Sequence, residues 1–121
     1  MAAVTQDQRF DSALMYASEA LQDDKEIVTT AVAQNWRALR YASEKLKNNK
    51  EIVIAAVAQN GLALEFASDT QKNDQEIVLI AVAQNGLALR FVGDILKNNQ
   101  EFMSYIIITE AQTVNNYKLR L

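Results

Sequence analysis

The nine residues at positions 56–64, AVAQNGLAL, recur unchanged at positions 81–89. A third copy at positions 31–39 reads AVAQNWRAL and differs from the others only at Trp36 and Arg37. The three copies start 25 residues apart and align without a gap. A fixed period of this length is typical of proteins built from stacked repeats, so the fold depends on what one 25-residue unit forms.

The repeat extends over most of the 121-residue chain. We predict a single repeat domain, 1–121, with four units and an irregular C-terminal cap. The expected units are 11–35, 36–60, 61–85 and 86–110, and the cap is 111–121. Both ends depart from the pattern, as expected for terminal units that face water on one side.

The first half of each unit has the apolar spacing of an α-helix. Apolar residues recur at i, i+1, i+4 and i+5, which places them on one helical face. The middle unit shows this spacing at Ile52, Val53, Ala56 and Val57. Asparagine or aspartate precedes each stretch as an N-cap, and Gly61 or Gly86 follows it, where a left-handed residue commonly ends a helix.

The second half of each unit is predicted to form a second helix of about three turns. Asn35, Asn60 and Asn85 lie between the two halves. We predict that each asparagine ends the first helix and caps the second with its side-chain oxygen. The chain is therefore expected to be an all-α protein, an α-solenoid of four 25-residue helix-pair repeats.

A leucine-rich-repeat-like horseshoe is the alternative fold, because 25 residues lies within the period of that class. Its consensus fits best at Ile77, Ile80, Val82, Asn85 and Leu87. The fit is poorer in the other units, where Thr30 and Ala55 occupy a core strand position and Arg37 replaces a leucine. The stretch that would form the strand is also rich in alanine and glutamine, which are poor strand formers, so the helical fold is favoured.

Composition excludes several function classes. The chain has no cysteine and no histidine, which removes disulfides, thiolate metal sites and the commonest general base. A formal net charge of −3 argues against binding to nucleic acid. No apolar run approaches the ~18 residues of a membrane span, and no secretory signal is evident. We expect a protein that binds neither membrane nor nucleic acid, located in the cytoplasm or delivered into a host cell without a classical signal peptide.

The assembled pattern, AV-x-x-NG-x-AL-x-(F/Y)-AS-x-x-LK-x-(N/D)-x-E-(I/V)-V, covers about residues 12–105. It resembles a tandem helical-repeat family catalogued as a domain of unknown function and seen in bacteria, including secreted effectors of intracellular pathogens, and in protists. The resemblance implies a helix-pair repeat and transfers no catalytic residue. The chain departs from the pattern at Trp36, at Gly93 in place of serine and at Gln71 in place of leucine.

Residues repeated in every unit are best explained by folding and stacking, so we predict no catalytic, cofactor-binding or metal-binding residue and no enzyme activity. Binding residues are expected where exposed positions differ between units. Trp36, Arg37 and Arg40 form the first candidate site, because tryptophan and arginine are enriched in binding hot spots. An expected ladder joins Arg40 and Arg90 to Glu65 beside it.

The apolar outer side of the first helices, with Ile54, Leu79 and Ile80, forms a second candidate site for a partner peptide or helix. We therefore predict a non-enzymatic protein-protein interaction or scaffolding module whose partner is an unknown protein or peptide. The chain itself is expected to be a monomer or a weak homo-oligomer. Two alternatives remain: a self-associating structural repeat protein, and a secreted pathogen effector or accessory domain that acts on a host protein.

Overall fold

The computed structural model describes residues 14–108, and every regular element in this range is a helix. Three ten-residue α-helices repeat at the 25-residue period: α3 (Lys25–Gln34), α5 (Lys50–Gln59) and α7 (Gln75–Gln84). Residues 100–108 continue the series as a further helix. The all-α prediction is confirmed. The horseshoe alternative is wrong, because residues 14–108 contain no strand.

The second half of each unit forms two short helices instead of the predicted single helix. A six-residue 3-10 helix comes first: η1 (Trp36–Tyr41), η2 (Gly61–Phe66) or η3 (Gly86–Phe91). A one-turn α-helix follows, and this series comprises α2 (Glu19–Gln22), α4 (Glu44–Lys47), α6 (Asp69–Lys72) and α8 (Asp94–Lys97).

The break between the two short helices has a local cause in the Ala-Ser pair. Ala67 and Ser68 both adopt extended backbone angles, with ψ of 158° and 162°. The Ser68 hydroxyl then accepts a hydrogen bond from the backbone N–H of Gln71, 3.4 Å away, and so starts a new helix. In the units that have this serine, its side chain competes in this way with the helical backbone and favours the break.

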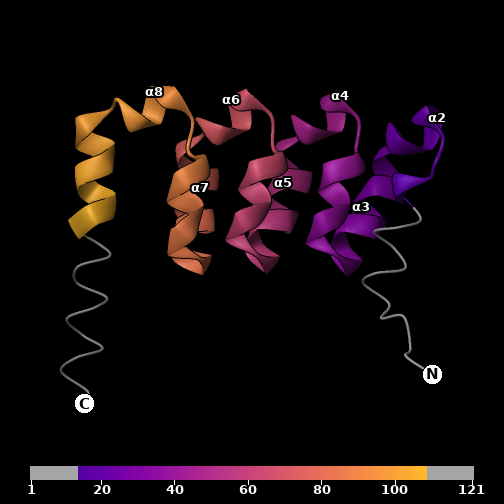
Figure 1. Ribbon diagram of the computed structural model, residues 1–121, viewed down its shortest axis with the longest axis horizontal. Coiled ribbons are helices and arrows are strands. Elements are labelled where there is room, and N and C mark those ends of the chain that lie inside the picture. Colours follow the sequence, from indigo (N-terminus) through magenta and orange to yellow (C-terminus); the bar gives the residue numbers. More distant parts are fainter. Residues whose placement is uncertain (1–13, 109–121) are drawn as a thin grey trace, which may run out of the picture.

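The units stack into a regular array (Figure 1). Helices α3, α5 and α7 lie side by side, the 3-10 helices pack behind them, and the one-turn helices follow one edge. Along that edge the backbone N–H at the break donates to a carbonyl of the preceding unit: Ser43 to Gln22 (2.9 Å), Ser68 to Lys47 (3.1 Å) and Gly93 to Lys72 (2.9 Å). Neighbouring units are thus joined by main-chain hydrogen bonds as well as by side-chain packing.

The hydrophobic core lies between the long helices and the 3-10 helices. Equivalent residues of successive units form buried columns: Val28, Val53 and Val78 on the long helices, and Leu39 and Leu64 on the 3-10 helices. Burying an aliphatic side chain of this size contributes about 1.5–3 kcal/mol. Helices this short are marginal in isolation, so the stacking of units supplies most of their stability.

The predicted left-handed conformation at Gly61 and Gly86 is wrong, since no described glycine has a positive φ. The long helix ends because Asn60 is extended (φ −153°, ψ 118°), and no left-handed residue is needed. Gly61 has a different role. A Cβ at this position would lie 2.9 Å from the carbonyl carbon of Ala81 on α7, so the close approach of the next unit requires glycine.

Candidate binding surface

The 3-10 helices are oriented by the asparagines that precede them. The Oδ1 atom of Asn35 accepts a hydrogen bond from the backbone N–H of Arg37 at 2.9 Å. Asn60 and Asn85 make the same bond to Leu62 and Leu87, at 2.9 and 3.0 Å. Each asparagine therefore ends a long helix and caps the following 3-10 helix with one side chain.

Trp36 reaches from its own unit onto the next one. Its indole stacks against the ring of Phe66, with a distance of 6.3 Å between ring centroids and an interplanar angle of 23°. Trp36 starts η1 and Phe66 ends η2, so the pair joins the two 3-10 helices. The indole is half-buried and packs against the hydrophobic core, which fixes its position before any partner arrives.

Arginines lie over the aromatic rings of this face. The Arg37 guanidinium carbon is 4.7 Å from the centroid of the Trp36 ring. Arg40 lies 5.7 Å from the ring of Tyr41, and Arg90 lies 5.8 Å from the ring of Phe91. Each arginine is exposed to solvent. Such cation–π contacts contribute about 0.5–1 kcal/mol at exposed sites and hold the guanidinium groups in place.

The expected Arg40–Glu65–Arg90 ladder is wrong, because no ion pair in the described part of the chain includes Glu65. The arginines lie over neighbouring rings instead, and an exposed ion pair would stabilise the chain by only ~0–1 kcal/mol. Three arginines and one glutamate are the charged residues of η1, η2 and η3, so these helices carry a formal charge of +2. We call Trp36, Arg37, Arg40, Tyr41 and Phe66 the aromatic–arginine surface.

A shallow pocket of about 410 Å³ adjoins this surface. It is lined by Arg40 and Phe66, together with Lys47 and the carboxylates of Glu44 and Glu65. Lys47 pairs with Glu44 at 3.4 Å, so one cation of the pocket is already neutralised within its own helix. Within residues 14–108 neither Arg40 nor Glu65 forms an ion pair, so both charges of the pocket remain for a ligand to meet.

The second candidate site lies on other elements. Ile54 is on α5 and Leu79 and Ile80 are on α7, whereas Trp36, Arg37 and Arg40 are all on η1. Ile54 and Ile80 are half-buried against the core, and only Leu79 is exposed. The structure therefore brings the first set of candidate residues together on one short helix. In the second set, Ile54 and Leu79 occupy equivalent positions of the adjacent helices α5 and α7, but only Leu79 is exposed.

The sequence analysis did not include Phe66 and Tyr41 in the candidate site. Both rings are half-buried, as is Phe91 at the equivalent position. For Tyr41 the available signal was the preceding arginine, Arg40, as Arg90 precedes Phe91. Phe66 follows Glu65, so no such signal marks it. An arginine next to an aromatic residue places its guanidinium within reach of a cation–π contact, even though the ring also packs against the core.

Another charged cluster lies at the start of the long helices. Lys50 Nζ lies 3.1 Å from Asp74 Oδ2 and 2.9 Å from Glu76 Oε2, in the next unit. Its hydrogen bonds with Glu76 and Asp74 raise the pKa of Lys50. Partial burial disfavours the Asp74 carboxylate, but the N–H of Ile77 and the Lys50 ammonium outweigh it and lower the pKa of Asp74. This cluster joins two units and stabilises the array.

Residues 14–108 lack two further kinds of functional feature. No group of three or more acidic, cysteine or histidine side chains is arranged to hold a metal ion. No helix in this part of the chain is long and apolar enough to cross a membrane.

Comparison with known proteins identifies one family. The model of a family described as a domain of unknown function (DUF4116) matches residues 1–47, 31–72 and 74–109. No curated protein and no solved structure matches the chain. The three matches cover most of the sequence and reflect its repetition, and the family's description names no activity.

Proposed function

The chain belongs to the DUF4116 family, and we propose that it is a non-enzymatic protein-binding module whose partner contacts the aromatic–arginine surface. The observation that carries this proposal is the Trp36–Phe66 stack with Arg37 over the indole. Tryptophan, tyrosine and arginine dominate binding hot spots because they combine large contact area with hydrogen-bonding capacity.

The surface is pre-organised for binding. The Asn35 cap holds the backbone of η1, and the Phe66 ring holds the indole, so few side chains need to be ordered when a partner binds. Immobilising a flexible side chain on binding costs about 0.5–1.5 kcal/mol. Because these side chains are already held in place, less of that cost remains and the affinity for a partner is higher. Arg37 and Arg40 remain exposed and provide the donors for direct hydrogen bonds.

The charge of the surface indicates the chemistry of the partner. The three 3-10 helices carry +2 in a chain whose formal net charge is −3. An acidic segment with an apolar or aromatic residue would pair its carboxylates with Arg37 and Arg40 and place the apolar group on Trp36. The local positive charge would also steer such a segment to this face and away from the acidic remainder.

Affinity capture from an extract of the source cells tests this proposal. The natural chain is compared with the double variant Trp36→Gly and Arg37→Leu, which introduces the residues found at positions 61–62 and 86–87. Since two other units fold with these residues, the variant removes the binding groups and keeps the repeat. We expect a partner that is retained by the natural chain, lost by the variant, and bound more weakly as salt is raised.

A matched control changes a distant exposed residue, Ile95→Glu on α8, and should leave capture unchanged. Far-ultraviolet circular dichroism establishes that both variants retain their helices. Equal capture by the natural chain and the double variant would contradict the proposal, because the partner would then bind elsewhere.

A further inference from the structure

The first described unit exposes apolar residues that are buried in every other unit. Ile27, on α3, is 39% exposed, whereas Ile52 and Ile77 at the same position of α5 and α7 are 1% and 0% exposed. Leu21 is 43% exposed, whereas the equivalent Leu46 is 2% exposed. The difference arises because the preceding unit covers these positions in the interior of the array.

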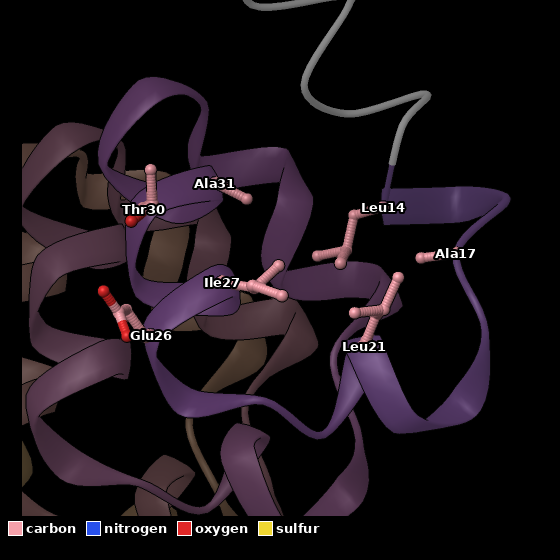
Figure 2. A pocket seen from close by; sticks show the side chains of 7 residues that line it. All are labelled: Leu14, Ala17, Leu21, Glu26, Ile27, Thr30 and Ala31. Atoms are coloured by element: carbon pink, nitrogen blue, oxygen red, sulfur yellow. The ribbon is translucent and has the colours of Figure 1, made fainter.

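These residues form a pocket at the N-terminal end of the array. Its volume is about 410 Å³, and its lining is almost entirely apolar. In Figure 2, the side chains of Leu14, Leu21 and Ile27 converge on it, and Thr30 and Glu26 stand at its margin. Among residues 14–108, the pocket is therefore the face that a preceding unit covers in the interior of the array.

The opposite end of the described array exposes the complementary half. Ile107, in helix 100–108, is 60% exposed, whereas Val32 and Val57 at the same position of α3 and α5 are completely buried by the unit that follows. The burial of Val32 and Val57 in interior units and of Ile52 and Ile77 in units that have a predecessor indicates that the valine and isoleucine columns lie on the two faces of each internal junction. The two ends thus carry the two faces that already pack together inside the molecule.

We propose that copies of this chain stack head to tail, with helix 100–108 of one copy packed beside α3 of the next. The occupant of the N-terminal pocket is then Ile107 of a second copy, which would meet Ile27 and Leu21 as Val57 meets the following unit in the interior. Such an interface joins different surfaces of identical chains, so it continues into longer assemblies unless it closes into a ring. This inference is independent of the aromatic–arginine surface.

Analytical ultracentrifugation over a concentration series, from micromolar to about millimolar, tests the proposal. We expect the natural chain to associate progressively beyond the dimer. Ile27→Glu blocks one end and Ile107→Glu blocks the other, so each variant alone should be monomeric. An equimolar mixture of the two should form a dimer and nothing larger, because each variant retains one intact end that fits the intact end of the other.

Ile95→Glu is the matched control. Ile95 is 71% exposed, but its equivalents Lys45 and Thr70 are exposed in the interior units too, so the position lies outside every junction. This variant should associate like the natural chain. Formation of the dimer in the mixture shows that both end variants are folded. Circular dichroism of each variant alone measures its helix content directly.

Three results would overturn the proposal. The first is a natural chain that stays monomeric throughout the series. The second is association that persists in Ile27→Glu and Ile107→Glu. The third is a monomeric chain in which the substitution Ile27→Glu sharply lowers the midpoint of unfolding. This would mean that another segment of the same chain covers the pocket.

Discussion

The side chain of Asn73 occupies the space beside Gly93 that a serine side chain fills in the other units. Its Oδ1 atom accepts the hydrogen bond from the backbone N–H of Leu96 at 3.2 Å. In the preceding unit the equivalent hydrogen bond runs from the backbone N–H of Gln71 to the hydroxyl of Ser68, a residue of the same unit. A Cβ at position 93 would lie only 2.5 Å from Asn73 Nδ2. The missing serine is thus replaced by an asparagine from the previous unit.

This replacement predicts strong coupling between the two positions. Asn73→Ala removes the hydrogen bonds to Leu96 and Asp69 and should cost about 1 kcal/mol. Adding Gly93→Ser to that variant should restore most of the loss, because the introduced hydroxyl can cap α8 once the asparagine is absent. Chemical denaturation of both single variants and the double variant measures this. Additive effects of the two substitutions would contradict the exchange of roles.

Gln71 is a buried polar residue at a position that leucine occupies in neighbouring units, and replacing it should stabilise the array. Its Nε2 donates to the Asn48 carbonyl at 2.8 Å, but its Oε1 is buried without a hydrogen-bond partner. Gln71→Leu removes this desolvated oxygen and introduces the residue found at the equivalent positions of neighbouring units, Leu46 and Leu96. We expect a gain of about 1 kcal/mol in the free energy of unfolding. Thermal denaturation checks the direction, and a lower midpoint would refute it.

The two central glycines should differ in their tolerance of a side chain. Gly61→Ala would force a Cβ against the Ala81 carbonyl, so we expect destabilisation of about 1–3 kcal/mol. Gly86 has the same place in the next unit but is exposed, and Gly86→Ala should have a smaller effect. Urea denaturation of the two variants under the same conditions compares them. Equal losses would show that backbone conformation, and not the approach of α7, requires glycine.

The Lys50–Asp74 contact should make stability depend on acid pH. The folded-state pKa of Asp74 is lowered from its ordinary value of 3.8, so its contribution is present above that value and disappears as pH falls through the lower folded-state pKa. Lys50→Met should reduce this loss of stability at acid pH. Lys25→Met is the control, because Lys25 and Glu51 form a longer and more exposed pair at 3.6 Å. Unfolding midpoints between pH 6 and about pH 2 measure both slopes; identical slopes would contradict the assignment.

Features that depend on residues close in sequence were predictable. The long helices and the role of Asn60 follow from apolar spacing and from one side chain acting on the backbone two residues away. The break at Ser68 was missed because the apolar residues around it are three apart, a spacing that fits both a 3-10 helix and an α-helix. The capping signal was present, since serine three residues before an N–H is a common helix start.

Contacts between units were harder to predict. Trp36 was identified as an exception to the repeat, but its stacking on Phe66 depends on the distance between η1 and η2, which no local pattern specifies. The same holds for Gly61, whose packing against Ala81 depends on how closely α7 approaches. Both the aromatic–arginine surface and the need for glycine at position 61 follow from the way neighbouring units stack.

The most direct test of partner binding at Trp36 uses the fact that the chain contains one tryptophan. Chain labelled with 5-fluorotryptophan gives a single fluorine resonance, which is titrated with the captured partner while calorimetry measures binding in parallel. We predict that this resonance shifts or broadens and saturates with the same affinity that calorimetry reports. Saturable binding that leaves the resonance unchanged would contradict the account, because the partner would then lie away from the Trp36–Phe66 stack.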